Sequence, residues 1–138
     1  MTQKIPVSSS LKENIDYLNQ LFQKDITVKI RQFSNVENSD IRMCVFFVDG
    51  LTSEEFISED IIAPIMHTKQ LQEGTDLFVT VRDRVLIGCN ISCSDDMSEL
   101  LTSFLRGDAI LLTDGHPQGI IISAKNWTIR SANRIPKE

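Results

Sequence analysis

The sequence is poor in cysteine, glycine and aromatic residues, and each scarcity excludes a class of protein. Its 138 residues include three cysteines, six glycines, one tryptophan and one tyrosine. An odd number of cysteines does not build a disulfide framework and is typical of a reducing compartment. The glycines are scattered and form neither a G-x-x-x-x-G-K nor a G-x-G-x-x-G phosphate loop. A disulfide-stapled scaffold and a phosphate-loop nucleotide site are therefore excluded.

Positive charge and long apolar runs are also scarce. The chain has 14 Lys and Arg against 19 Asp and Glu, a net charge of -5. Binding to nucleic acid or to anionic lipid relies on clustered Lys and Arg, so neither is expected. No run approaches the roughly 18 apolar residues of a membrane span, and the first residues lack the apolar core of a secretory signal. The sequence predicts a soluble chain, which can still be a piece of a larger protein.

The remaining composition is that of one globular domain. Hydrophobic residues make up 41% and charged residues 24% of the chain, which suits a single core at this length. Apolar residues at helical spacing predict helices over 10–23, 51–66 and 94–107. Alternating or continuous apolar runs predict strands over 25–33 and 41–50, which could pair as a hairpin.

Two places in this pattern are harder to assign. Pro64 falls in the last turn of the second helix and is expected to kink or end it. In the segment 76–84, Leu77 and Val81 have helical spacing, whereas the many β-branched residues favour a strand. Helix or strand stays open there, and a short helix followed by a strand near 85–91 is the favoured interpretation.

The stretch RGDAILLTDGHPQGIII, residues 106–122, predicts a helix end followed by a β-hairpin. Gly107 stands where a helix C-terminal glycine belongs, so the RGD tripeptide is a helix–strand junction and not an adhesion loop. The turn residues of DGHPQG connect two apolar strands and predict a hairpin over 108–124. His116 is expected at the tip of this turn, exposed to solvent and without a catalytic role.

These elements predict an α/β fold: a mixed four- to five-stranded sheet with packed helices and a C-terminal β-hairpin. Leu101 and Phe104 form the apolar stripe of the last helix and should pack against the strand at 109–112. The prediction is one domain over 1–138, with the basic tail 128–138 as an exit linker.

Residues that could carry chemistry are few. Cys89 and Cys93 are four positions apart and distant in sequence from His67 and His116. Structural zinc sites show closely spaced cysteine or histidine pairs, so neither a metal nor a cofactor is expected. Cys44 lies in an apolar run and is expected to be a small buried hydrophobe.

The single tryptophan is the other residue of interest. Trp127 lies near Arg130, and the two could form a cation–π contact or an anchor for a partner protein. The alternative is an aromatic ring that packs over the sheet edge after the last strand, and this interpretation is favoured.

Taken in order, the segments resemble the A-subunits of spore germinant receptors, the GerA family. LNQLFQKDITVKIRQF is similar to that family's opening helix and a strand with a characteristic arginine, here Arg31. VFFVDGL resembles its apolar strand ending in Asp-Gly, here Asp49 and Gly50. IIAPIM resembles its helix with an internal proline, here Pro64.

The longest similarity is FLRGDAILLTDGHPQGIIISAKNWTIRSA. The family has a helix, Gly-Asp, an apolar strand, Asp-Gly, a turn, a second apolar strand, an aromatic residue and Arg-Ser in this order. The tail departs from the pattern, because Asn133 and Arg134 stand where the family usually has acidic residues and Pro136 comes one place late. Glu138 matches the family's closing glutamate.

The resemblance implies a non-enzymatic receptor domain that contacts neighbouring subunits or a small nutrient germinant. The positions that match the motifs become candidates for ligand or subunit contacts: Arg31, Asp49, Asp108, Asp114, Trp127 and Arg130. The five acidic and arginine positions among them also have structural roles open to them, such as turns and an ion pair across the sheet. The structural interpretation of those five is favoured.

The resemblance also implies a setting. The chain would be the first part of a larger soluble N-terminal region, followed by membrane helices, on the cytoplasmic (core) side of the spore inner membrane. Its partners would be B-type and C-type receptor subunits, and it would act in spore germination through receptor assembly, germinant sensing or signal relay.

Two further hypotheses stay open. The first is a small cysteine-dependent hydrolase that uses Cys89 or Cys93 with His67 or His116, which requires a nucleophile, a base and an orienting group to meet in the fold. The second is an interaction module without a ligand of its own.

Overall fold

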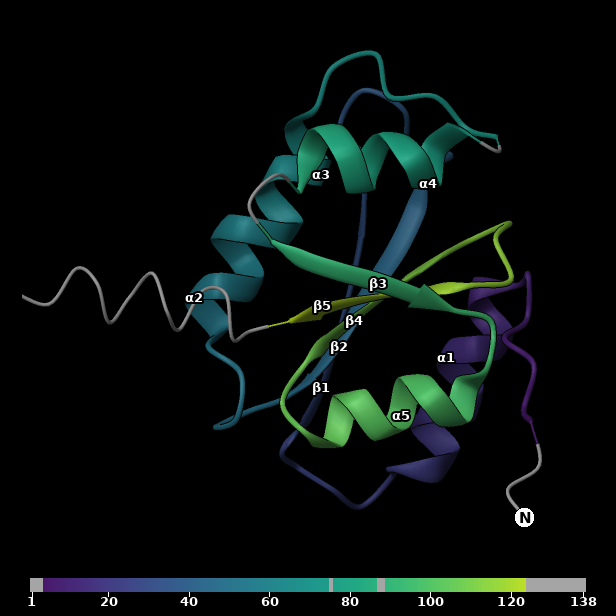
Figure 1. The fold of residues 1–138 in the computed structure, drawn as a ribbon, viewed down its shortest axis with the longest axis vertical. Coiled ribbons are helices and arrows are strands. Elements are labelled where there is room, and N and C mark those ends of the chain that lie inside the picture. Colours follow the sequence, from purple (N-terminus) through teal and green to yellow (C-terminus); the bar gives the residue numbers. More distant parts are fainter. Residues whose placement is uncertain (1–3, 75, 87–88, 124–138) are drawn as a thin grey trace, which may run out of the picture.

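The computed structural model describes residues 4–74, 76–86 and 89–123. A five-stranded sheet in the order β1-β2-β4-β5-β3 forms its centre, with helices on both faces (Figure 1). The strands are β1 (Val28–Ser34), β2 (Arg42–Val48), β3 (Asn90–Ser94), β4 (Ala109–Thr113) and β5 (Gly119–Ser123). The predicted α/β class, the five strands and both hairpins are confirmed.

The direction of the strands differs from the prediction in one respect. Each neighbouring pair in the described sheet is antiparallel, whereas a mixed sheet was expected, with parallel as well as antiparallel pairs. The turns after β1 and after β4 fix two of these pairs, because a short connection can only join antiparallel neighbours. The two hairpins then join through β2 and β4, which also run in opposite directions.

Two helices cover one face of the sheet, α1 (Leu11–Leu21) and α5 (Met97–Leu105). The Ser10 hydroxyl accepts a hydrogen bond from the Glu13 N–H, and the Asp96 carboxylate accepts one from the Ser98 N–H. These side chains satisfy N–H groups that the first helical turn leaves without partners, which is why the helices begin there. The helices predicted over 10–23 and 94–107 are confirmed.

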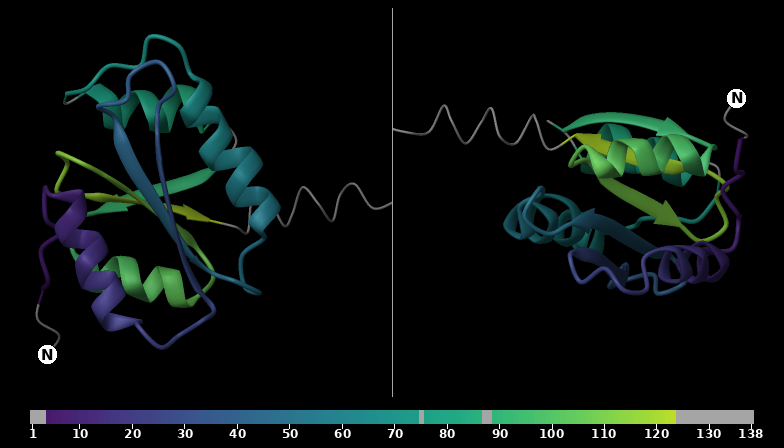
Figure 2. Two further views of the ribbon diagram at one scale, coloured as in Figure 1. Left: turned by 180° about the vertical axis from the view of Figure 1, so that it is seen from behind. Right: turned by 90° about the horizontal axis from the view of Figure 1, so that it is seen from below.

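The other face carries two helical runs, seen from behind and from below in Figure 2. The first comprises α2 (Glu54–Phe56), the π-helical η1 (Ile57–Ile62) and α3 (Ala63–His67), and the second comprises α4 (Asp76–Thr80) and the π-helical η2 (Val81–Val85). Of the two outcomes predicted for Pro64, a kink or a helix end, the helix end is wrong, because Pro64 lies in the first turn of α3. Its ring would collide with the carbonyl four residues before it, and the wider π-helical turn ahead of it accommodates this.

The segment after residue 75 is helical up to Val85, in agreement with the favoured interpretation. The strand after it is β3 at Asn90–Ser94, not 85–91. Leu77, Val81 and Leu86 are all buried against the sheet. Because all three side chains pack on the sheet from a helical segment, the helix continues to Val85 and β3 can start only after Leu86.

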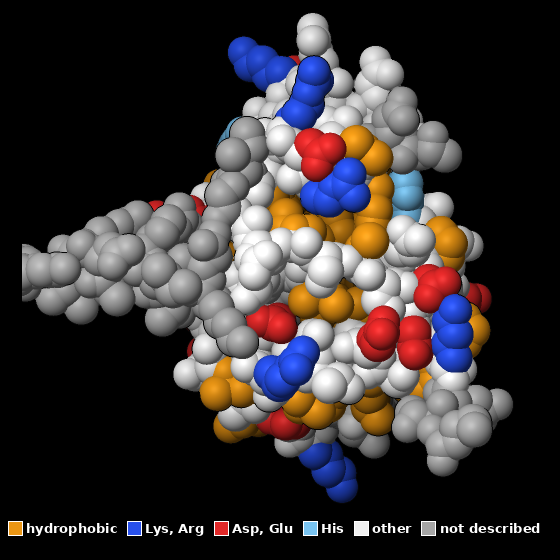
Figure 3. All heavy atoms as spheres, viewed as in Figure 1, with side chains coloured by type: hydrophobic (Ala, Val, Ile, Leu, Met, Phe, Trp, Pro, Cys, Tyr) orange, Lys and Arg blue, Asp and Glu red, His pale blue; other side chains and the backbone are white. Residues whose placement is uncertain are grey.

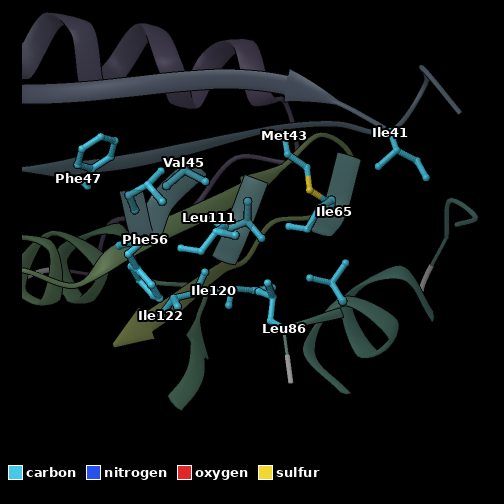
Figure 4. Packing of buried hydrophobic residues seen from close by; sticks show 14 of the residues in the cluster. Ile41, Met43, Val45, Phe47, Phe56, Ile65, Leu86, Leu111, Ile120 and Ile122 are labelled. Carbon is cyan, nitrogen blue, oxygen red and sulfur yellow. The ribbon is translucent and has the colours of Figure 1, made fainter. Parts of the chain in front are cut away.

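The core has two parts, one on each face of the sheet. Along β2, Met43, Val45 and Phe47 point to one face, while Cys44 and Phe46 point to the other. Figure 4 shows the first cluster, to which β2, β4, β5 and the two helical runs α2–η1–α3 and α4–η2 contribute. This alternation is the period-two pattern of a strand buried on both faces.

The cluster under α1 and α5 bears out the predicted stripe. Phe104 is fully buried with Ile110 and Leu112, and Leu101 is partly buried beside them. The Phe104 ring lies 5.0 Å from Phe46, between centroids.

The N-terminal segment 5–9 ties the two ends of this face together. The Val7 N–H donates to the Asp95 carbonyl, and the Ile5 N–H donates to the Asp96 carboxylate. At the other end, the Gly115 N–H donates to the Ser9 carbonyl. The segment therefore links the start of α5 to the β4–β5 turn.

Candidate functional site

Among the predicted site residues that the structure describes, Asp114 connects the most elements. One carboxylate oxygen accepts the Leu11 N–H at 2.9 Å, and the other accepts Nη2 of Arg42 at 2.6 Å. These contacts lower the pKa of Asp114, chiefly through the Leu11 hydrogen bond and then through Arg42, while desolvation opposes them. Asp114 therefore stays ionised and joins the start of α1 to the start of β2.

A groove opens beside this pair, between α1 and the neighbouring ends of β1 and β2. Its volume is about 670 Å³, within the range of small-molecule sites. The lining residues are Ser10, Leu11, Lys12, Ile15, Asp16, Asn19, Gln32, Phe33, Ser34, Arg42, Met43 and Asp114. We call it the α1 groove.

The α1 groove combines charges of both signs with neutral polar groups. Lys12 and Asp16 form an ion pair of 3.0 Å on its helical wall, and Arg42 and Asp114 form a second ion pair in its lining. Gln32 on β1 adds an amide. This lining suits a small polar molecule or a polar segment of a partner, since oriented polar groups in a cleft provide specificity.

Arg31 lies elsewhere. It forms an ion pair with Glu54 of α2, and both side chains are about half exposed. The pairing with a carboxylate that the sequence suggested exists, but the partner comes from the helical layer and not from a neighbouring strand. Exposed pairs of this kind contribute little to stability.

Asp49, which precedes Gly50, and Asp108, which follows Gly107, both lie in connections between elements. Asp49 is exposed and precedes Gly50, whose φ of 97° is cheap only for glycine. Asp108 is half-buried, and its N–H donates to the Ser103 carbonyl after the end of α5. Arg31, Asp49, Asp108 and Asp114 thus lie in separate parts of the described structure, and Trp127 and Arg130 lie outside the described residues.

His116 is not the exposed turn residue that was expected. It is half-buried and stacks on Phe78, with ring centroids 5.8 Å apart. Cys44 is fully buried, as predicted, and burial raises the pKa of its thiol to about 12. Cys89 is partly buried and Cys93 exposed. Within the described ranges, no three His, Cys, Asp or Glu side chains gather in a way that could hold a metal ion.

Sequence reasoning missed Arg42 and the groove. Alternation along β2 does place Arg42 on the same face as Cys44 and Phe46. Its meeting with Asp114 depends on the β2–β4 register, in which Met43 faces Thr113. That register joins segments far apart in the chain, so no local pattern reveals it.

The model of the Bacillus/Clostridium GerA spore germination protein family matches residues 16–138. The chain belongs to the GerA family. Among curated relatives, the uncharacterized membrane protein YfkQ of Bacillus subtilis is 29% identical over 94% of this chain. Spore germination proteins KA and B1 of the same organism are 23% and 24% identical over 91% and 96% of the chain. The chain spans about a quarter of the length of these relatives.

A solved structure has the same fold. The N-terminal domain of the A subunit of the Bacillus megaterium spore germinant receptor GerK3 superposes with a TM-score of 0.73 at 22% identity. The match covers 88% of this chain and 49% of that one. The names of these GerA proteins and neighbours give no support to a cysteine hydrolase. No helix in the described part of the chain is long and apolar enough to cross a membrane.

Proposed function

We propose that this chain is the first part of the N-terminal region of a germinant receptor A-type subunit. It acts in spore germination without catalysing a reaction, through receptor assembly and germinant sensing, and relays a conformational bias to the membrane part. Membership of the GerA family supports the role in germination. The observation that carries the binding role is the α1 groove, with the Arg42–Asp114 pair in its lining.

The proposal extends to the setting of the domain. The full-length protein is embedded in the spore inner membrane, with this domain on the core side and B-type and C-type subunits as partners. Residues 1–138 form the first subdomain, and 128–138 link it to the next part of the receptor subunit. The name of the relative YfkQ, a membrane protein of which this chain covers 24%, supports a longer membrane-bound chain.

The groove suits a signalling role because its walls come from separate elements. Lys12 and Asp16 are on α1, Gln32 is on β1 and Arg42 is on β2. A ligand that contacts all three elements would favour the arrangement in which they lie closest. Such unequal affinity for two arrangements is what coupling between sites requires.

The test is a thermal-shift screen of the chain against amino acids, sugars and nucleosides. A ligand at 100 times its dissociation constant adds about 2.7 kcal/mol to the free energy of unfolding. Arg42→Ala and Lys12→Ala should abolish the shift. Arg31→Ala is the matched control, because it removes an exposed, ion-paired arginine outside the groove, and it should keep the shift.

The same three variants in the full-length protein test the role in spores. We expect Arg42→Ala to delay germination with one class of nutrient and Arg31→Ala to leave it unchanged. If no compound in the screen shifts the melting temperature, and if Arg42→Ala spores lose the receptor subunits from the membrane, the groove is a contact surface for another subunit. Normal germination of Arg42→Ala and Lys12→Ala spores would refute a role for the groove.

A further inference from the structure

Four large aliphatic side chains are exposed where three connections between elements meet. The exposed fractions are 49% for Leu21, 86% for Ile26, 58% for Leu51 and 61% for Leu105. They lie in or beside the α1–β1, β2–α2 and α5–β4 connections. We call these four residues the apolar end.

Hydrogen bonds hold the three connections together. The Asp49 N–H donates to the Thr27 carbonyl, which joins the β2–α2 connection to the α1–β1 connection. The Thr52 hydroxyl donates to the Gly107 carbonyl at 2.6 Å, which joins the β2–α2 connection to the α5–β4 connection. Figure 3 shows hydrophobic side chains gathered along the lower left of the molecule, around the C-terminal end of α5. Single exposed hydrophobic residues are ordinary, but a cluster brought together from three connections marks an interaction surface.

The last described strand leads the chain to this end of the domain. β5 runs back along β4, so its end meets the start of β4. Ser123, the last residue of β5, lines a small pocket together with Arg106 and Asp108 of the α5–β4 connection. Leu105 directly precedes that connection. Residues 124–138 therefore begin beside the apolar end.

We propose that residues 124–138 fold back over the apolar end, with Trp127 against its exposed aliphatic side chains. Trp127 follows Ser123 by four positions, so the Cα atoms of the two residues lie at most about 14 Å apart. This short tether gives the indole ring a high effective concentration at the apolar end, so weak contacts suffice to hold it there.

The segment 124–138 supplies the kind of side chain that the apolar end lacks. None of the four exposed residues is aromatic, whereas Trp127 is the only tryptophan of the chain. Ile129 comes two positions later, so both side chains point to the same side wherever the backbone is extended. Packing an indole ring on aliphatic side chains removes a large apolar area from water, which favours docking.

The charges of the two surfaces are opposite. The three connections carry an excess of negative charge, from Asp25, Asp49 and Asp108 against Lys24 and Arg106. Residues 124–138 carry an excess of positive charge, from Lys125, Arg130, Arg134 and Lys137 against Glu138.

This complementarity favours the segment over a second copy of the chain as the occupant of the apolar end. A symmetric dimer brings the same patch of both copies together, so two negatively charged surfaces would face each other. Docking of residues 124–138 brings opposite charges together instead, and added salt should weaken it in part by screening that attraction.

The test uses the emission of Trp127, because the chain has no other tryptophan. We expect the tryptophan emission of the folded chain to lie at shorter wavelength than that of the chain unfolded in urea. Acrylamide should quench it several-fold less in the folded chain. Trp127→Ala should increase the binding of the apolar dye anilinonaphthalene sulfonate, because the apolar end is then uncovered.

Leu51→Ser with Leu105→Ser tests the docking surface itself. The tryptophan emission should move towards that of the unfolded chain, because the loss of two apolar contacts shifts the docking equilibrium by on the order of tenfold. The matched control is Val36→Ser, because Val36 is also exposed, at 66%, and lies after β1 at the opposite end of the sheet. It should leave the emission unchanged. Far-ultraviolet circular dichroism confirms that each variant is folded.

A charge variant gives a second test that leaves the apolar contacts intact. Asp49→Asn should increase acrylamide quenching of Trp127, because it removes a negative charge beside the apolar end. Asp40→Asn is the matched control, since Asp40 is also exposed but lies before β2, at the other end of the sheet. It should leave the quenching unchanged.

Three results would overturn the proposal. The first is a tryptophan emission and quenching that are the same in the folded and the unfolded chain. The second is a protected Trp127 that responds equally to the Leu51→Ser, Leu105→Ser variant and to Val36→Ser, since the segment would then dock elsewhere. The third is protection that disappears on dilution, because a second copy would then cover the ring.

This outcome is separable from the proposed function. The α1 groove and the apolar end share no residue, and the fluorescence test contains no nutrient. A water-exposed Trp127 together with an intact Arg42-dependent ligand shift would remove the docked segment alone. A protected Trp127 without any ligand shift would remove the binding role of the groove alone.

Discussion

Arg42 and Asp114, 72 positions apart in the chain, meet at 2.6 Å between Nη2 and a carboxylate oxygen. The Asp114 N–H also donates to the Arg42 carbonyl, so backbone and side chain make the same connection. The other carboxylate oxygen of Asp114 holds the Leu11 N–H. One residue therefore fixes α1, β2 and the β4–β5 turn relative to one another.

Replacing Asp114 should cost more stability than replacing its partner. Asp114→Ala removes a charged acceptor from a backbone N–H and should lower the free energy of unfolding by about 1–2 kcal/mol. Arg42→Ala, in a mostly exposed side chain, should cost less than about 1 kcal/mol. Urea unfolding of both variants measures this, and equal losses would contradict the central role of the Leu11 contact.

Stability should fall in acid because of Asp96 and Asp114. The pKa of each is lowered from 3.8 in the folded chain, first by a backbone hydrogen bond from Ile5 or Leu11. A lowered folded pKa stabilises the fold above the unfolded value, and this contribution is lost as pH falls through the folded pKa. Urea unfolding from about pH 7 to about pH 3 should show a shallower decline for Asp96→Asn, Asp114→Asn. An unchanged decline would show that other carboxylates dominate.

Gly119 should not tolerate a side chain. A Cβ there would lie 2.5 Å from Cδ1 of Leu100, which packs α5 on β5. Gly119→Ala should therefore destabilise the fold by about 1–3 kcal/mol. Gly115→Ala is the control, since it has open space but a φ of 91°. In a Leu100→Ala background, the loss of stability caused by Gly119→Ala should shrink, whereas the loss caused by Gly115→Ala should persist. If the effects of Gly119→Ala and Leu100→Ala were simply additive, a clash between the new Cβ and the Leu100 side chain would be excluded.

Thr113 should be better as valine. Its hydroxyl oxygen is buried and has no hydrogen-bond partner in the described structure. Thr113→Val keeps the shape of the side chain and removes the desolvation cost of the hydroxyl. The free energy of unfolding should therefore increase by about 1 kcal/mol, and the melting temperature should rise. Thr113→Ala, which leaves a cavity, is the comparison. A loss of stability in Thr113→Val would mean that the hydroxyl has a bound water.

The cysteines should differ in reactivity. Burial raises the pKa of the Cys44 thiol to about 12 and removes it from solvent, whereas Cys93 is exposed. Iodoacetamide should alkylate Cys93 quickly and Cys44 only on global unfolding, because the thiolate is the reacting form. Peptide mass spectrometry after timed quenching measures both rates, and similar rates would imply that the β2 core opens locally.

Local signals in the sequence predicted the helices and strands well, but they did not predict the contacts between them. The capping groups Ser10 and Asp96 identify their helices because a helix start is a local event. The continuous apolar run around Phe46 likewise indicates a strand buried on both faces.

Contacts between distant segments could not be predicted in this way. The stacking of His116 on Phe78 and the pairing of Arg42 with Asp114 depend on where whole elements come to lie. The shift of β3 to Asn90 has the same cause, since the burial of Leu86 extends the preceding helical segment.

The position of β5 also has a mechanical consequence. β5 lies between β4 and β3 and is hydrogen-bonded to both. Tension applied to the chain beyond Ser123 would pull β5 along its length. The force would act in shear on the hydrogen bonds to β3 and to β4 at the same time, whereas an edge strand can be peeled away one hydrogen bond at a time. The last described strand is thus a firm anchor, able to transmit a pull from the residues after it to the sheet without unravelling.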